Sequence, residues 1–217
     1  MQRVAPRRIA NQVINGLYAI TPDELNTAEL MRKVQLALQG GARVVQYRNK
    51  LADPELKLQQ ALALRQLLNE FDATFLVNDD AQLAAQVDAD GVHLGIDDGG
   101  VATARTLLGK TKIIGVSCYN LASLAHEAAQ QGADYVAFGA FYSSSVKPDA
   151  AKASIAMLQT ARSELKLPIV AIGGITGQNG AALIEAGADA LAVISALWNA
   201  ANVKTGAQEF STLFSRT

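Results

Sequence analysis

Three cationic side chains are candidates for holding an anionic ligand. Arg48 and Lys50 lie close together in the segment VVQYRNK, and Lys147 follows a short run of serines. An arginine guanidinium can donate two hydrogen bonds to one phosphate group, whereas a lysine supplies a compact positive charge. The formal net charge of the chain is only −1, so an anion must be held by a local cluster. We therefore expect these three side chains to form such a cluster.

Two aspartates, Asp79 and Asp98, are candidates for a metal site. Asp79 ends one apolar run that is predicted to be a strand, and Asp98 follows the next such run along the chain. Two carboxylates at neighbouring strand ends repel each other unless a cation lies between them. Mg²⁺ suits such a site, because it accepts one or two carboxylates together with phosphate oxygens. Zinc is not expected, since the chain has one cysteine and two histidines.

Gly173, Gly174 and Ser195 indicate a second anion site. They lie at the ends of the last two predicted strands, and Ser195 opens the short segment ALWN. Glycines let backbone N–H groups approach a phosphate closely, and a helix N-terminus adds a favourable dipole. The glycine pair could instead serve only a tight turn, and that alternative stays open. Beside a diphosphate-sized site, this pattern favours two phosphorylated small molecules that meet in one pocket.

Eight apolar runs are predicted to be the strands that position these residues. They cover residues 16–21, 43–48, 74–79, 91–95, 113–117, 135–139, 168–173 and 190–195. Most are continuous rather than alternating, which is typical of parallel strands buried on both faces. Helical patterns separate them: Leu30, Val34 and Leu38 share one helix face, and Asp53 before Pro54 marks a helix start. Eight units in 217 residues predict a single-domain α/β fold, the (β/α)8 TIM barrel, with its active site at the carboxyl ends of the strands.

A weak internal repeat agrees with this count. The segments GARVV, DADGV, GADYV and GADAL precede every second predicted strand, and their alanines recur every 44 to 55 residues. We interpret the repeat as ordinary chemistry of the loops that lead from helix to strand. A doubly wound open sheet is the rival fold. It usually carries a glycine-rich loop after its first strand, where this chain has ITPDE.

Composition limits the domain plan, the partners and the compartment. We expect an N-terminal arm over residues 1–15, frayed and without the apolar core of a secretory signal, and a catalytic barrel over 16–217. Membrane spans are not expected, because no apolar run is long enough, and the near-neutral charge gives no reason to expect nucleic acid. A single cysteine, Cys118, indicates a reducing compartment such as the cytoplasm. The oligomeric state, including a homo-oligomer, stays open.

Several segments together resemble one family over almost the whole chain after the N-terminal arm. They are LYAIT, VVQYRNK, FLVNDDAQLAAQVDADGVHLGIDD, IGVSC, ADYVAFGAFYSSSVKP, PIVAIGGI and GADALAVISAL. This combination is similar to the thiamine-phosphate synthase family. The resemblance implies a (β/α)8 transferase of thiamine biosynthesis that uses Mg²⁺. Such an enzyme joins 4-amino-2-methyl-5-hydroxymethylpyrimidine diphosphate to a (carboxy)thiazole phosphate and releases pyrophosphate by Mg-assisted, dissociative cleavage.

The resemblance also implies a role for each site residue. Gln46 and Asn78 would contact the pyrimidine, and Asp79 and Asp98 would bind Mg²⁺. The diphosphate would be held by Arg48, Lys50, Ser117 and Lys147. The thiazole phosphate would be held by Ser144, Ser145, Val146, Gly174, Ile194 and Ser195.

Two positions depart from the family pattern. Ile96 stands where a glutamine is usual, and Val146 stands where a threonine hydroxyl would donate to phosphate. Such a charge-assisted hydrogen bond contributes roughly 1.5–3 kcal/mol, about ten- to a hundred-fold in affinity. Ser143 or Ser145 could compensate for the missing hydroxyl.

The alternatives are a thiazole tautomerase-like paralogue and a non-catalytic thiamine-phosphate binder. A tautomerase would not need the diphosphate and Mg²⁺ residues that this chain retains. A phosphate-sugar isomerase fits less well, because no predicted strand ends in the glutamate that such enzymes typically use as a base.

Three further residues have two interpretations each. His93 is either a hydrogen-bonded core residue or a substrate contact. Cys118 is predicted to be a small buried residue rather than a nucleophile. Trp198 is expected to cap the barrel or to pack at an interface.

Overall fold

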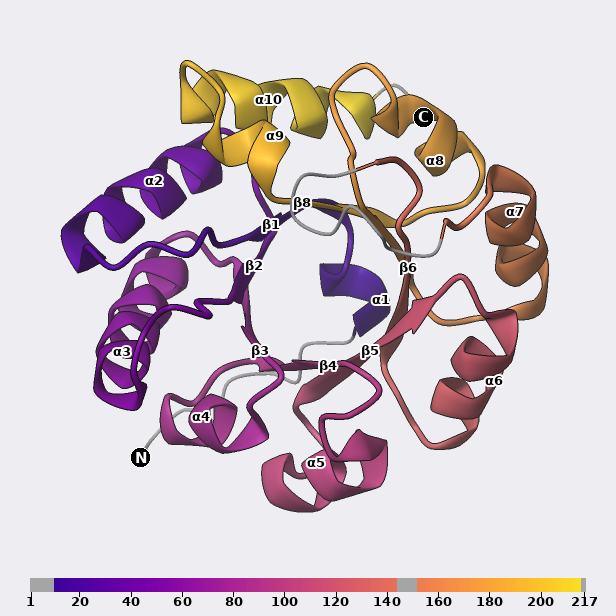
Figure 1. Cartoon of the computed structure of the whole chain (residues 1–217), viewed down its shortest axis with the longest axis horizontal. Helices are drawn as coiled ribbons and strands as arrows, with labels where there is room; N and C mark the ends of the chain where they lie inside the picture. The colour runs from indigo at the N-terminus through magenta and orange to yellow at the C-terminus, as the bar shows by residue number, and fades with distance from the viewer. Residues whose placement is uncertain (1–9, 144–151, 216–217) are drawn as a thin grey trace.

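The computed structural model describes residues 10–143 and 152–215 and contains a closed barrel of parallel strands (Figure 1). The strands are β1 (Gly16–Ile20), β2 (Val44–Tyr47), β3 (Thr74–Asn78), β4 (Gly91–Leu94), β5 (Ile113–Tyr119), β6 (Tyr135–Phe138), β7 (Ile169–Ile172) and β8 (Ala190–Val193). They follow one another around the ring, and β8 pairs with β1 from Gly16↔Ala190 to Ala19↔Val193. The predicted barrel is therefore confirmed, and the open sheet is excluded.

Helices surround the strands on the outside of the ring (Figure 1). They are α2 (Thr27–Gln39), α3 (Pro54–Glu70), α4 (Ala81–Gln86), α5 (Gly100–Leu108), α6 (Ala122–Gln130), α7 (Ile155–Glu164), α8 (Gly180–Glu185), α9 (Ser195–Trp198) and α10 (Val203–Leu213). Local sequence signals set their position. Leu30, Val34 and Leu38 are the buried face of α2, and Asp53 caps α3 by accepting the Leu56 N–H at 2.8 Å. None of the helices in the described ranges is long and apolar enough to cross a membrane.

The strands are continuously apolar because each of their faces is buried in a different core. In β1, Leu17 and Ala19 belong to the cluster that packs the helices against the barrel. Tyr18 and Ile20 belong to a second cluster inside the barrel. A parallel strand buried on both faces has no polar face to show in its sequence.

The N-terminal end of the barrel is closed by the short helix α1 (Ala10–Val13), which Figure 1 shows within the ring of strands. Ala10 and Ile14 are buried and belong to the interior cluster with Tyr18 and Tyr135. The described part of the predicted arm is therefore packed rather than frayed, because its apolar side chains fill the barrel end. The domain boundary at residue 16 stays a prediction.

The internal repeat has a structural purpose. Its aspartates Asp90, Asp134 and Asp189 accept the backbone N–H of Phe75, Ile114 and Ile169, at 2.8, 2.8 and 2.7 Å. Each also forms an ion pair with an arginine of an outer helix, namely Arg65, Arg105 and Arg162, at 3.1, 2.6 and 2.9 Å. Each aspartate thus ties the start of an even-numbered strand to the preceding strand and to a helix. The first repeat has Arg43 instead of an aspartate.

We predict that Asp134→Ala lowers the free energy of unfolding by about 1–3 kcal/mol, because the partly buried N–H of Ile114 loses its side-chain acceptor and the Arg105 guanidinium loses its ion-pair partner. Urea unfolding followed by circular dichroism measures this change. Asp88→Asn is the control, since the Asp88 side chain is 84% exposed and forms a surface ion pair with Lys112, and asparagine tolerates the φ of 50° at this position. Equal unfolding curves for the two variants would contradict the role given to the repeat.

Candidate active site

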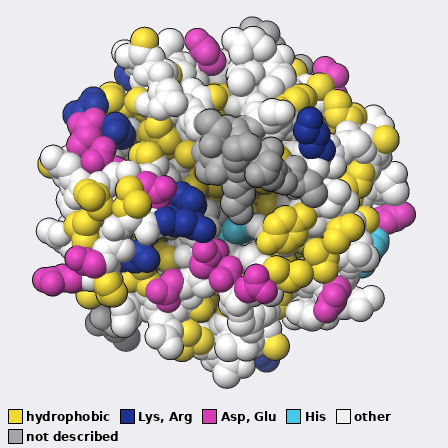
Figure 2. Space-filling view, in the orientation of Figure 1, with side chains coloured by type: hydrophobic (Ala, Val, Ile, Leu, Met, Phe, Trp, Pro, Cys, Tyr) yellow, Lys and Arg dark blue, Asp and Glu magenta, His cyan; other side chains and the backbone are white. Residues whose placement is uncertain are grey.

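A cavity of about 910 Å³ opens at the carboxyl ends of the strands. It is lined by every predicted site residue that the structure describes: Gln46, Arg48, Lys50, Asn78, Asp79, Asp98, Ser117, Gly174, Ile194 and Ser195. Basic and acidic side chains lie side by side at the centre of this face (Figure 2). Ser144, Ser145, Val146 and Lys147 lie outside the described residues. The structure thus brings these ten residues together, while their individual roles remain predictions.

The loop after β2 is held by hydrogen bonds that leave its cationic side chains at the cavity. Thr21 clamps the main chain of Arg48, because its hydroxyl donates to the Arg48 carbonyl and accepts the Arg48 N–H, both at 2.8 Å. Buried Asn49 donates to the Glu24 carbonyl at 2.7 Å and accepts from two following N–H groups. These hydrogen bonds restrict the backbone of the loop and so fix where the Arg48 and Lys50 side chains begin.

Asp23 also belongs to this region, although it was not among the predicted site residues. Both of its carboxylate oxygens lie 3.2 Å from Nη1 of Arg48, and Oδ1 accepts the Lys50 N–H at 2.6 Å. One carboxylate therefore orients the guanidinium and holds the loop. The position of Asp23 in the sequence could have indicated this role. It lies in the segment ITPDE at the carboxyl end of the first strand, and the carboxyl ends of all the parallel strands face the same cavity.

Asp79 and Asp98 lie next to each other across the ends of β3 and β4. Partial burial and the neighbouring Asp98 carboxylate raise the pKa of Asp79, whereas nearby Lys50 lowers that pKa. The backbone holds both residues in place: Asp79 has a φ of 63° and donates its N–H to the His93 carbonyl, and Gly95 donates to Oδ2 of Asp98 at 2.7 Å. Two adjacent carboxylates form a donor set that a hard cation fits.

The neighbouring carboxylate of Asp80 has a structural role. Asp80 caps α4 by accepting the Leu83 N–H at 2.8 Å. Within the described ranges, no group of three or more histidine, cysteine or acidic side chains is placed to hold a metal ion.

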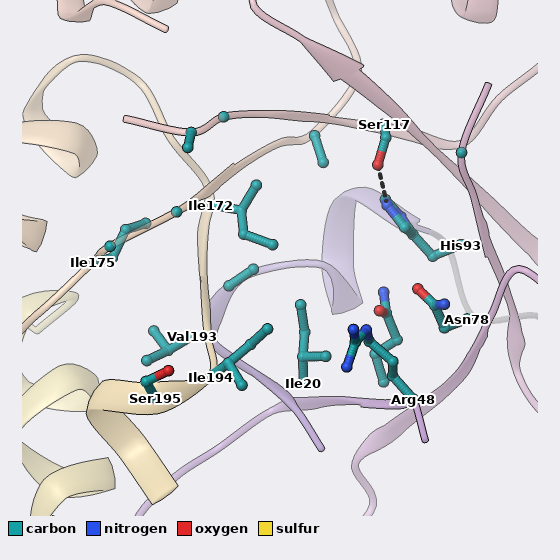
Figure 3. Close-up of a pocket in the computed structure, with 18 of the residues that line it drawn as sticks. Ile20, Arg48, Asn78, His93, Ser117, Ile172, Ile175, Val193, Ile194 and Ser195 are labelled. Carbon is teal, nitrogen blue, oxygen red and sulfur yellow. Dashed lines mark hydrogen bonds between the residues drawn. The ribbon is translucent and has the colours of Figure 1, made fainter. Parts of the chain in front are cut away.

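The far side of the cavity carries glycines, Ser195 and several aliphatic side chains. Figure 3 shows Ile194 and Ser195 on one side and Arg48, Asn78 and His93 on the other. Gly174 has a φ of +62°, and a Cβ there would lie 2.4 Å from the Ser143 carbonyl oxygen. Glycine is thus required where the loop after β7 approaches the loop after β6.

The floor of the cavity is polar. Both ring nitrogens of His93 are hydrogen-bonded, Nδ1 to the Tyr135 hydroxyl at 2.8 Å and Nε2 to Ser117 Oγ at 2.9 Å. Figure 3 shows the bond to Ser117. Burial lowers the pKa of His93 to about 4. His93 is therefore a buried, hydrogen-bonded residue, as the first interpretation expected. It also lines the cavity, and a contact with substrate stays a prediction.

Cys118 and Trp198 behave as structural residues. Burial raises the pKa of the Cys118 thiol to about 12, which agrees with a buried residue rather than a nucleophile. Trp198 is buried and donates its indole N–H to the Ile20 carbonyl at 2.6 Å, so it caps the end of β1.

Comparison with known proteins decides the family. A family model described as thiamine monophosphate synthase matches residues 17–197. The chain belongs to this family. It is 57% identical to a thiamine-phosphate synthase of Methylobacillus flagellatus over 201 residues, which cover 93% of this chain and 96% of the relative. It is 51% identical to that of Nitrosospira multiformis over 212 residues, with coverage of 98% and 89%.

A solved structure in the same family has the same fold. Thiamine phosphate pyrophosphorylase from Pyrococcus furiosus superposes with a TM-score of 0.86 at 34% identity, covering 95% of this chain and 98% of the other. The family resemblance inferred from the segments is thus confirmed. In this thiamine monophosphate synthase family member, the cavity is the place to test the predicted residue roles.

We predict that Arg48→Ala weakens the binding of inorganic pyrophosphate about ten- to a hundred-fold, since a charge-assisted hydrogen bond contributes roughly 1.5–3 kcal/mol. Calorimetric titration in the presence of Mg²⁺ measures the affinity. Arg32→Ala is the control, because that arginine side chain is 58% exposed and pairs with Glu29 on α2. Unchanged affinity in Arg48→Ala would remove Arg48 from the anion site.

Proposed function

We propose that the chain joins 4-amino-2-methyl-5-hydroxymethylpyrimidine diphosphate to a (carboxy)thiazole phosphate, giving thiamine phosphate and pyrophosphate. The observation that carries this proposal is the convergence of two cationic side chains, two adjacent carboxylates and a glycine-rich loop on one cavity. Membership in the thiamine monophosphate synthase family supports the same reaction.

The diphosphate end of the first substrate is bound by Arg48, Lys50 and Ser117, with Lys147 as the third cation. Gln46 and Asn78 contact the pyrimidine. The phosphate of the thiazole is bound on the opposite side by the backbone at Gly174 and Ile194 and by the Ser195 hydroxyl, together with Ser144, Ser145 and Val146. This division follows the two sides of the cavity, which is cationic beside β2 and lined by glycine and serine after β7 and β8.

Asp79 and Asp98 would hold Mg²⁺. When bound, the metal supplies positive charge that neutralises the phosphate oxygens of the leaving group. The raised pKa of Asp79 supports this role, because a cation beside the two carboxylates relieves the repulsion that contributes to it.

The residues of the chain act by position and charge. Arg48 and Lys50 donate to oxygens whose negative charge rises as the bond between the pyrimidine methylene carbon and the diphosphate oxygen breaks. The electron pair of that bond leaves with pyrophosphate, and the thiazole nitrogen then donates its lone pair to form the new C–N bond. Holding both substrates in one cavity places the nitrogen beside the carbon. No covalent intermediate with the protein is needed.

A tautomerase-like paralogue or a non-catalytic binder would have less use for the cations and carboxylates of the β2–β4 side. Ile96 lines the cavity but is 61% exposed, so this departure does not replace a deeply buried contact. Both observations favour the synthase over the two alternatives. We also place the protein in the cytoplasm, in keeping with its single, free cysteine.

The test is an assay with purified protein, both substrates and Mg²⁺, in which thiamine phosphate and pyrophosphate are quantified. We expect both products in equal amounts, and none when either substrate or Mg²⁺ is omitted. Isomerised thiazole phosphate without thiamine phosphate would favour the tautomerase. Binding of thiamine phosphate with no reaction at high protein concentration would favour the binder.

We predict that Asp79→Asn raises the Mg²⁺ concentration needed for half-maximal activity by more than about tenfold. Losing even an indirect partner of a metal ligand typically weakens metal affinity about 10- to 100-fold. Asp80→Asn is the matched control, because asparagine caps a helix as well as aspartate does. If the two variants had the same Mg²⁺ dependence, Asp79 would not be a metal ligand.

A further inference from the structure

Five side chains form one continuous hydrogen-bonded chain across the barrel interior. Gln46 Nε2 donates to the Tyr18 hydroxyl at 2.7 Å, and the Tyr18 and Tyr135 hydroxyls lie 2.9 Å apart. The Tyr135 hydroxyl lies 2.8 Å from His93 Nδ1, and His93 Nε2 lies 2.9 Å from Ser117 Oγ. The members come from β2, β1, β6, β4 and β5, so the chain connects opposite parts of the cavity floor.

The middle of this chain is rigidly packed. Tyr18 and Tyr135 are 1% and 0% exposed, and their rings meet edge to face with centroids 6.3 Å apart. The His93 ring stacks on Tyr135 at 5.6 Å. Gly115 makes room for the Tyr135 ring, since a Cβ there would lie 2.0 Å from its Cζ. The hydroxyls therefore have few other positions to adopt.

The donor and acceptor properties of the groups give the chain a direction. A glutamine amide nitrogen can only donate, so the Tyr18 oxygen accepts and its single proton is left for Tyr135. Tyr135 accepts that proton and donates its own to His93 Nδ1. A neutral imidazole that accepts at Nδ1 carries its proton at Nε2, so it donates to Ser117 Oγ.

Burial supports the neutral form of every link. It raises the pKa of both tyrosines, so each hydroxyl keeps one proton. His93 is 9% exposed, and its two hydrogen-bond partners are hydroxyl groups rather than carboxylates.

We propose that Tyr18, Tyr135 and His93 are positioning residues that polarise this chain, presenting the Gln46 amide oxygen as an acceptor and the Ser117 hydroxyl as a donor. The Gln46 oxygen then suits the amino group of the pyrimidine. The Ser117 proton, which the chain leaves unused, suits an anionic oxygen of the diphosphate. The assignment of these two ligand groups rests on the proposed function, whereas the direction of the chain does not.

The first test is the tautomer of His93 in the free protein, measured by ¹⁵N NMR on a sample labelled in histidine. The protein has two histidines. The second, His126, has a side chain that is 43% exposed and pairs with Glu164, and it serves as the internal reference. We expect a neutral His93 with its proton on Nε2. A proton on Nδ1, or on both nitrogens, would overturn the proposed direction whatever the activity of the protein.

The second test is Tyr135→Phe, which keeps the ring and removes the link. We expect His93 to lose its fixed Nε2–H tautomer and the KM for the pyrimidine diphosphate to rise about three- to tenfold, the effect of one hydrogen bond. The KM for the thiazole phosphate stays within twofold of wild type. Tyr47→Phe is the control for the tautomer, because the buried Tyr47 hydroxyl donates to Gln60 and is not part of the hydrogen-bonded series from Gln46 to Ser117.

The outcomes separate the two proposals. A wild-type tautomer and KM in Tyr135→Phe would overturn the positioning role while leaving the synthase reaction intact. An Nε2–H tautomer in a protein that makes no thiamine phosphate would overturn the proposed function and leave the directed chain standing. If Tyr135→Phe does not fold, the tautomer of the wild-type protein still decides the direction.

Discussion

The pairing of β8 with β1 is the contact on which the site depends. It closes the sheet, so that β1 lies between β8 and β2 and all strand ends meet around one cavity. In an open sheet with the same strand order, Arg48 after β2 and Ser195 after β8 would lie near opposite edges. Closure brings the cationic side and the glycine-rich side of the cavity within reach of one another, and this proximity is what a reaction between two phosphorylated molecules requires.

The two ends of the barrel use charged residues in different ways. At the N-terminal end, the repeated aspartates form ion pairs with arginines and accept hydrogen bonds from backbone N–H groups. Their charge therefore helps to hold the strands together. At the C-terminal end, Asp79 is held beside Asp98 although the Asp98 carboxylate raises the pKa of Asp79. Charged residues thus stabilise the fold at the N-terminal end of the barrel. At the C-terminal end, the repulsion between two carboxylates would be relieved by a bound cation.

Much of this arrangement could be predicted from the sequence because it depends on local patterns. Continuous apolar runs identified the strands, and the Asp53–Pro54 pair identified the start of α3. Residues just after the strands, such as Asp79 and Asp98, could be assigned to one cavity because parallel strands end on the same side.

Other parts depend on contacts that only the folded barrel creates. Tyr18 and Tyr135 look like apolar strand residues, and only closure of the sheet brings their hydroxyls 2.9 Å apart from segments 117 residues distant. The ion pair between Asp23 and Arg48 likewise joins two loops on different strands. Pairings of this kind follow from register and side-chain direction around the ring, which no single segment of the sequence encodes.

The most direct measurement is a crystal structure of the protein with Mg²⁺, pyrophosphate and thiamine phosphate. We expect pyrophosphate against Arg48 and Lys50, the metal between Asp79 and Asp98, and the phosphate of the product beside Gly174 and Ser195, all in the one cavity. Product bound outside this cavity, or pyrophosphate and product phosphate competing for a single position, would contradict it.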